Sequence, residues 1–282
     1  MAMGRKRRRG RRGLGLLCIL LLLLSAYLYS NLYLQTEHFT LSLPGLPQAF
    51  DGYRVVQLSD LHGRQFGRDN RRLLQAVQKQ QPDLIVLTGD LVDAACSVDQ
   101  EQPLVCGLVE IAPVYYVTGN HEWAAGFAPQ LKQLLREAGV ICLENQAVPL
   151  EKDGEQILLA GVEDPNGYAG QKSPQQLGQE IQEAYGDIFW ILLAHRNVNY
   201  PEYAALGAGL ILTGHAHGGI IRLPFTDGLI GPNREWFPTW TAGLYTDYAT
   251  PMFVSRGLGN SPHWAWRLFN PPQLAVLELR ML

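Results

Sequence analysis

The sequence predicts an α/β (or α+β) fold of packed sheets and helices, preceded by one transmembrane helix. After residue 50, short apolar runs typical of buried strands alternate with amphipathic segments of helical period, which favours layers of sheet and helix. Residues 14–34 carry no charge and are long enough to cross a bilayer. Several apolar runs end in Asp, His or Asn, and α/β folds collect functional side chains at the ends of their strands.

The N-terminal segment differs in composition from the rest of the chain. Residues 1–13 hold seven Lys and Arg and no acid, and residues 14–34 are uncharged. Because positively charged flanks stay in the cytosol, we expect a single-pass anchor or signal-anchor in the cell membrane. Its N-terminus would be cytosolic and the rest of the chain extracytoplasmic. The alternative is a cleaved signal peptide, although Ser25-Ala26-Tyr27 is a poor match to a cleavage site.

Beyond this segment the chain is acidic. Seven of the 23 Lys and Arg precede residue 14, whereas all 26 Asp and Glu follow it, so the remainder carries about −10. Nucleic-acid binding needs cations that neutralise phosphate, so we expect no nucleic-acid partner. No obligate protein partner is implied. The cysteines form no CxxC pair, and Cys96 and Cys106 either close a short disulfide loop or remain free thiols.

The elements follow from periodicity along the chain. Residues 35–50, with Pro44 and Pro47, are predicted to be a linker. Strands are predicted at residues 54–58, 84–88, 114–117, 140–142, 156–160, 188–193, 209–212, 252–255 and 274–279. Helices are predicted at residues 69–80, 102–111, 129–138 and 174–184. The segment 220–249 is aromatic and rich in Gly and Pro, and a loop of this length is often functional.

Five polar motifs follow predicted strands. In chain order they are Asp60-Leu61-His62, Gly89-Asp90, Gly119-Asn120-His121-Glu122, Ala194-His195 and Gly214-His215-Ala216-His217. They supply carboxylate, imidazole and amide ligands without thiolate, a set that suits Mn, Fe, Zn or Co. Two such ions about 3.5–4 Å apart can activate a water and neutralise a phosphoryl group. The motifs therefore predict a two-metal hydrolase.

The spacing within the motifs suits metal binding. Asp60 and His62 lie two residues apart, on one side of an extended strand end, so both can hold one ion. His215 and His217 have the same spacing and can serve one ion each. Asp90 ends its own strand and is the natural bridge between the two ions.

As an ordered set, the motifs D-x-H, G-D-x-x-D, G-N-H-E, a lone His and G-H-x-H resemble those of calcineurin-like metallophosphoesterases. The N-terminal membrane segment and the run Gly214–Gly219 are similar to the membrane-associated bacterial branch typified by YkuE and YaeI. The resemblance implies that residues 51–282 form a four-layer αββα sandwich. It also implies hydrolysis of a phosphomonoester or phosphodiester through a metal-bridging hydroxide, with Mn favoured among the candidate metals.

The resemblance also assigns roles. One ion would be held by Asp60, His62, Asp90 and His217, and the other by Asp90, Asn120, His195 and His215. His121 would stabilise the phosphoryl oxygens or protonate the leaving oxygen, and Asp93 would orient that histidine. The sequence departs from the branch at Asn197, where Pro is common, and at Ile220, where Gln is common. Neither position is a ligand, so these departures bear on substrate fit.

The sequence leaves alternatives open for the residues that contact substrate and for the function. Arg64 is a candidate for contact with a substrate phosphate. The alternative is that Arg64 is an ordinary solvated arginine in a loop. The stretch 236–266 is typical of a core, but Trp236 and Trp240 are candidates for a ledge that receives a lipid-linked phosphoester at the membrane. One alternative function is a pyrophosphatase acting on a nucleotide- or lipid-linked precursor. An alternative of another class is a non-catalytic scaffold of this fold, which the complete ligand set disfavours.

Overall fold

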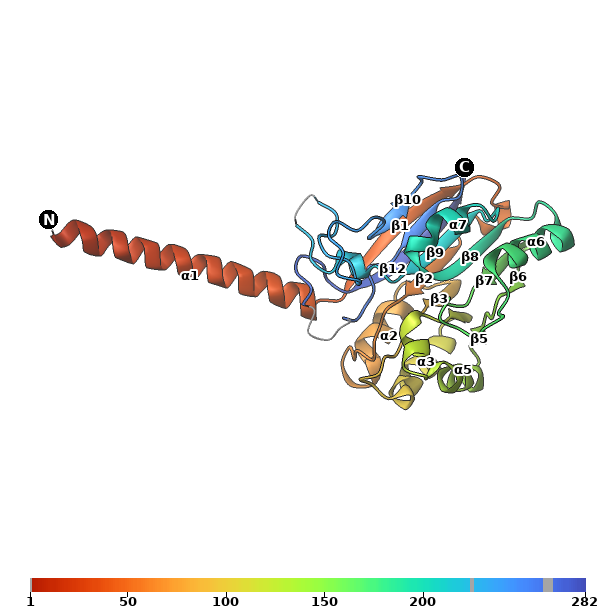
Figure 1. Cartoon of the computed structure of the whole chain (residues 1–282), viewed down its shortest axis with the longest axis horizontal. Coiled ribbons are helices and arrows are strands. Elements are labelled where there is room, and N and C mark those ends of the chain that lie inside the picture. The colour runs from red at the N-terminus through yellow and green to blue at the C-terminus, as the bar shows by residue number, and fades with distance from the viewer. Residues whose placement is uncertain (1, 224–225, 261–265) are drawn as a thin grey trace.

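Two six-stranded sheets lie face to face, and helices cover the outer side of each (Figure 1). The structure is a computed structural model, which describes residues 2–223, 226–260 and 266–282, with side chains from residue 14 onward. In spatial order the first sheet contains β1 (Gln35–Leu43), β12 (Gln273–Met281), β2 (Arg54–Leu58), β3 (Leu84–Thr88), β4 (Val114–Val117) and β5 (Ile141–Cys142). The second contains β10 (Gly243–Tyr245), β11 (Met252–Val254), β9 (Leu210–Gly214), β8 (Trp190–Arg196), β7 (Glu155–Gly161) and β6 (Gln146–Lys152).

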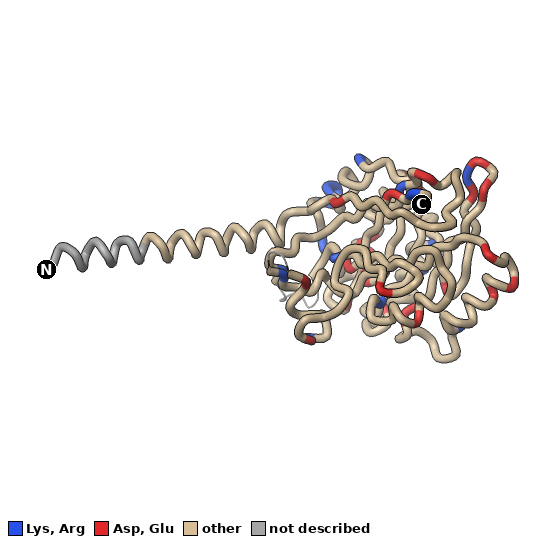
Figure 2. The backbone as a smooth tube through the Cα atoms, turned by 90° about the horizontal axis from the view of Figure 1, so that it is seen from above, with Lys and Arg blue, Asp and Glu red and all other residues tan. Residues whose placement is uncertain are grey.

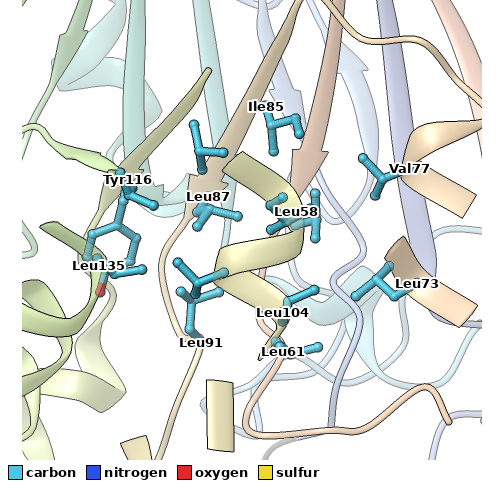
Figure 3. Close-up of a cluster of buried hydrophobic side chains, with 14 of the residues drawn as sticks. Leu58, Leu61, Leu73, Val77, Ile85, Leu87, Leu91, Leu104, Tyr116 and Leu135 are labelled. Atoms are coloured by element: carbon cyan, nitrogen blue, oxygen red, sulfur yellow. The ribbon is translucent and has the colours of Figure 1, made fainter. Parts of the chain in front are cut away.

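The central strands are buried on both faces, which is why their sequences are continuous apolar runs. In β3, Leu84 and Val86 point into the core between the sheets, whereas Ile85 and Leu87 point outward. Figure 3 shows the outward set packing against helices on the outer side of the first sheet. These helices are α2 (Arg71–Gln78), α3 (Gln102–Val109) and α5 (Ala128–Glu137). On the second sheet, α6 (Pro174–Tyr185) and α7 (Tyr200–Ala204) cover a third cluster. The four-layer αββα architecture is therefore confirmed.

The strand directions bring the polar motifs to one end of the sandwich. The strands β2, β3 and β4 run parallel, as do β8 and β9, so within each sheet their carboxyl ends share one edge. Gln57 aligns the two sheets, since its amide donates to the hydroxyl of Thr88 at 2.8 Å and to the carbonyl of Thr213 at 2.9 Å. The motifs that follow these strands consequently meet between the sheets.

The helix α1 (Ala2–Leu32) extends away from the domain (Figure 1). Within the described part of the chain, Leu14–Leu32 is the one stretch long and apolar enough to cross a membrane, and little of it is buried. Figure 2 shows no charged residue in this stretch. Only near its end does α1 meet the domain, where Ala26, Ser30 and Asn31 are buried.

The predicted linker at residues 35–50 is wrong. This segment forms β1, which pairs in parallel with β12 at the edge of the first sheet, followed by a turn and the 3-10 helix η1 (Gln48–Phe50). Only Leu41 and Leu43 of β1 are buried, so its apolar alternation is too short to identify a strand. Its partner strand is also more than 200 residues away. Strands β6 and β10 were likewise not predicted, whereas the remaining predicted elements are confirmed to within a few residues.

The disulfide alternative is also wrong. All four cysteines are free thiols, including Cys96 and Cys106. Cys96 instead lies beside Asp93, whose backbone N–H is 3.1 Å from its sulfur. The core between the sheets, rather than a covalent link, therefore holds the domain together.

Replacing Leu193 with Ala should destabilise the domain strongly, because this side chain is completely buried in the core between the sheets. We expect the free energy of unfolding to fall by about 2–5 kcal/mol, from lost burial and the cavity left behind. Leu244→Ala in β10 removes the same atoms from an exposed position and should cost under about 1 kcal/mol. Denaturant unfolding of the full chain in detergent measures both, and equal losses would contradict this assignment of the core.

Candidate metal centre

The five motifs converge between the carboxyl ends of the strands. Six of their side chains form two groups, and within each group the potential donor atoms lie within 4.8 Å of one another. The first group is Asp60, His62 and His217, and the second is Asp90, His195 and His215. All six residues are buried. The structure thus brings together the residues that the sequence predicted to share two ions.

The first group has the spacing of ligands around one cation. Nε2 of His62 lies 3.3 Å from Nε2 of His217, which lies 3.6 Å from Oδ1 of Asp60. Donors about 2.1 Å from a shared ion, at angles between 90° and 120°, are about 3.0–3.6 Å apart. The carboxylate of Asp60 is held in place by the backbone N–H of His215, at 3.0 and 3.1 Å from its two oxygens.

The second group is centred on His195. Its Nε2 lies 3.1 Å from Oδ2 of Asp90, 3.2 Å from Oδ1 of Asn120 and 3.2 Å from Nδ1 of His215. The other ring nitrogen, Nδ1, lies 2.8 Å from the carbonyl of Thr88. When Nδ1 donates to that carbonyl, the lone pair of Nε2 is directed into the group, which is the usual arrangement of a metal-binding histidine.

Asp90 connects the two groups. Its Oδ2 pairs with Nε2 of His195 at 3.1 Å and lies 3.8 Å from Nε2 of His62. Its Oδ1 accepts a hydrogen bond of 2.8 Å from the backbone N–H of His121. A buried carboxylate oxygen is stable only beside positive charge or hydrogen-bond donors, so one that faces the imidazoles of both groups is suited to hold cations there.

The electrostatics of the site also favour cations. Burial alone would raise the pKa of Asp90, but His195 and His62 hold it well below its usual value. Although burial opposes it, Asp90 raises the pKa of His195 to about 10. Burial lowers the pKa of His215 to about 3 and that of His217 well below its usual value, which leaves both imidazoles neutral. Neutral imidazole is the form that binds metals, so His215 and His217 are in the binding form, whereas His195 would lose a proton to an incoming cation.

The ligand positions are held in an unfavourable backbone conformation. Five of the seven have positive φ, namely Asp60 (51°), His62 (49°), Asp90 (54°), His215 (67°) and His217 (49°). For residues other than glycine this region costs about 1–3 kcal/mol each, and such residues cluster at functional sites. The loops also approach closely, since a β-carbon on Gly119 would overlap the carboxylate of Asp90.

Glu122 holds the loops that carry the second group in place through hydrogen bonds. It is completely buried at the start of α4 (Asn120–Ala124). Its carboxylate accepts the backbone N–H groups of Asp90 at 3.1 Å, Leu91 at 2.6 Å and Gly119 at 2.9 Å. Burial, and next the charge of Asp90, raise its pKa to about 8. These bonds tie the loop after β3 to the loop after β4, so Glu122 positions Asp90 and Asn120 relative to each other.

His121 and Asp93 border the first group. His121 is half-buried, and its ring meets that of His62 edge-on at 4.8 Å between centroids. Oδ2 of Asp93 lies 3.4 Å from Nδ1 of His62, and donor atoms of Asp93, His62 and His121 lie within 4.8 Å of one another. Asp93 therefore pairs with His62 and lies close to His121.

The structure places the predicted substrate contacts outside the metal groups. The guanidinium of Arg64 donates to the carbonyls of Leu258 and of Asn31 in α1, and burial lowers its pKa to about 10. Trp236 is exposed. Trp240 is half-buried, packs edge-on against Tyr200 and donates from Nε1 to Asp247 at 2.7 Å.

Sequence reasoning missed Arg267. This arginine is 1% exposed, and its Nη2 lies 3.5 Å from Nδ1 of His217. Its guanidinium also donates to the carbonyl of Gly259 and, at 2.8 Å, to the side chain of Asn260. Arg267 follows no strand and belongs to no motif, so no local signal identifies it.

Replacing Glu122 with Gln should weaken metal binding without unfolding the domain. The amide nitrogen cannot accept an N–H group, so the loops that carry Asp90 and Asn120 lose part of their alignment. Changes of such supporting residues typically lower metal affinity about 10–100-fold. Equilibrium dialysis against Mn²⁺ with elemental analysis measures the affinity, with exposed Glu110→Gln as the matched control. Unchanged affinity in Glu122→Gln would contradict the positioning role.

Comparison with known proteins agrees with this site. Residues 53–219 match the family model described as calcineurin-like phosphoesterase. The chain is 29% identical to the uncharacterized metallophosphoesterase YkuE of Bacillus subtilis, over 90% of this chain and 88% of that protein. It is 27% identical to phosphodiesterase YaeI of Escherichia coli, over 80% of this chain and 82% of that protein.

A vertebrate relative links the domain to a membrane segment. The zebrafish (Danio rerio) transmembrane protein with metallophosphoesterase domain is 29% identical over 76% of this chain, which corresponds to half of that protein. The family match covers more than half of the chain and includes all seven ligand candidates. The chain therefore belongs to the calcineurin-like phosphoesterase family, and it is a metal-dependent phosphoesterase.

Proposed function

We propose that the protein is a membrane-anchored, dinuclear metal-dependent phosphoesterase that hydrolyses a phosphomonoester or a phosphodiester. The proposed ligands of one ion are Asp60, His62, Asp90 and His217, and those of the other are Asp90, Asn120, His195 and His215. The observation that carries the proposal is the position of Oδ2 of Asp90, which faces the imidazoles of both groups. The oxygen and nitrogen donors suit Mn, Fe, Zn or Co, and the family resemblance favours Mn.

The chemistry divides between the ions and the chain. Two bound divalent ions would supply a water of lowered pKa and would offset the charge of a phosphoryl group. The half-buried His121 is the candidate that faces substrate. Burial lowers the pKa of His121, so its neutral ring prevails at neutral pH. A neutral imidazole donates one hydrogen bond, which favours stabilisation of a phosphoryl oxygen over full proton transfer to the leaving group. Asp93 supports this ring and that of His62.

The proposed topology follows from the N-terminal segment. Residues 1–13 would stay in the cytosol, because seven cations lie there, and residues 14–34 would span the membrane. The phosphoesterase domain would then lie on the extracytoplasmic side and begin at residue 35, where β1 joins the first sheet. Contacts of Asn31 with the domain support retention of the helix rather than its removal as a signal peptide.

Replacing Asp90 with Asn should abolish hydrolysis, because the amide lacks the charge needed to hold two cations. The assay uses the full chain in nanodiscs, stripped of metal and resupplied with Mn²⁺, Zn²⁺ or Fe²⁺. Bis-p-nitrophenyl phosphate and p-nitrophenyl phosphate then rank diester against monoester turnover. A residual activity in Asp90→Asn close to that of the wild type, at equal protein folding, would refute the two-metal site.

Replacing His121 with Ala should lower kcat while leaving metal content intact, because His121 is not a proposed ligand. General acid–base and hydrogen-bonding groups of this kind typically contribute about 10²–10⁴-fold to rate. His38→Ala on exposed β1 is the matched control and should leave kcat unchanged. Loss of bound metal in His121→Ala, measured by elemental analysis, would assign His121 to the ligand set instead.

A further inference from the structure

A small lobe follows the last metal-binding motif. It begins after the 3-10 helix η5 (His217–Gly219) and is joined by single bridges rather than by regular strands. The bridges pair Ile221 with Leu268, Arg222 with Gly228, and Ile230 with Trp236. Backbone hydrogen bonds from Leu229 to Ile221 and from Phe237 to Leu229 complete it. We call residues 220–222, 228–237 and 266–269 the aromatic lobe.

The aromatic lobe presents large apolar side chains to the surroundings. Trp236 is 70% exposed, Phe237 72%, Trp266 66% and Phe269 39%. Exposed aromatic residues gathered on one structural unit usually mark a binding surface or a membrane contact. Trp240 differs from these four, because it packs inward against Tyr200.

The lobe lies beside the end of the membrane helix. The ring of Trp266 meets that of Tyr27 in α1 edge-on, with 5.7 Å between centroids. Tyr27 belongs to the apolar stretch and precedes Leu32, the end of the helix, by five residues. At about 1.5 Å per residue this is about 7–8 Å along the helix. A bilayer spanned by α1 therefore reaches the level of Trp266, the interfacial layer that Trp and Tyr prefer.

Hydrogen bonds fix this arrangement. The side chain of Asn31 donates to the carbonyl of Arg267 at 2.8 Å, and its oxygen accepts the backbone N–H of Arg267 at 3.3 Å. The guanidinium of Arg64 binds the carbonyl of Asn31. The domain is therefore docked on the helix end rather than tethered by a flexible segment, and Figure 1 shows α1 leaving from this end of the domain.

The same lobe is attached to the metal centre. The amide of Asn270 donates to the carbonyl of His217 at 2.7 Å and to that of Ile220 at 3.2 Å. Arg267 lies between Asn31 and His217. A short run of contacts thus joins the membrane helix, the aromatic lobe and a proposed metal ligand.

We propose that the aromatic lobe is a second membrane contact. Its four exposed aromatic side chains would enter the interfacial layer of the bilayer that α1 spans, and the metal centre would be held against the lipid headgroups. This inference rests on the proposed function and narrows its substrate class. The favoured substrate is a phosphoester that remains in the membrane through an apolar group, with its phosphate at headgroup level.

The membrane contact is tested by fluorescence quenching on the full chain in nanodiscs that contain brominated phosphatidylcholine. Trp236→Tyr should remove a clear part of the quenchable tryptophan signal, because bromine quenches only indoles within the bilayer. Tyr185→Trp is the control, since Tyr185 is 48% exposed on α6, far from α1 (Figure 1), and the added indole should escape quenching. Unchanged quenching in Trp236→Tyr would overturn the proposal. A dimer in detergent that Trp236→Tyr dissociates would also overturn it, because a second copy would then cover the lobe.

The substrate class is tested by comparing two diesters. The double substitution Trp236→Ser and Phe237→Ser should lower kcat/KM for hexadecyl p-nitrophenyl phosphate in nanodiscs at least about tenfold, because membrane seating scales with buried apolar area. For water-soluble bis-p-nitrophenyl phosphate the change should stay within about twofold. Equal losses on both diesters would refute the membrane-held substrate. Absence of wild-type turnover on both would count against the proposed function, while the quenching result would still decide the membrane contact.

Discussion

Asp60 and Asp90 are buried together in one site, and a buried carboxylate is stable only with positive charge or hydrogen bonds close by. The chain meets this need with backbone N–H groups on one side and with imidazoles on the other. The N–H groups come from loops at the ends of different strands, so the carboxylates also bind these loops to one another. The αββα layers and the parallel strands are what bring such loops together.

The unfavourable backbone conformation at the site follows from the need to bring the ligand side chains together. Asp60 and His62 were expected on an extended strand end, but the chain turns sharply there instead. Positive φ at five ligand positions is the result. Glu122 compensates by accepting three N–H groups that the turns would otherwise leave buried and unpaired. The ligand positions therefore destabilise these loops, and the hydrogen bonds accepted by Glu122 offset part of that cost.

Local pattern was sufficient for most strands, most helices and the residues that gather at the site. Each ligand candidate follows an apolar run that reveals its strand, and parallel strands end at a common edge. Contacts between segments that are distant in sequence could not be predicted from local pattern. The strand β1 shows little alternation, and Arg64 was expected near substrate although it binds the end of α1. Arg267 has no motif around it, and its place beside His217 depends on how the aromatic lobe folds back.

The order of strands in the first sheet has a consequence for how the protein is made. The strand β12, from residues 273–281, lies between β1 and β2, which are near neighbours in sequence but do not pair. Until β12 has been synthesised, both strands expose unpaired backbone edges beside the membrane helix, and such edges invite aggregation. The pairing of β1 with β12 spans more than 200 residues, and contacts so distant in sequence slow folding. The contacts of Asn31 with Arg267 and Asn260 likewise form only after those residues have been synthesised.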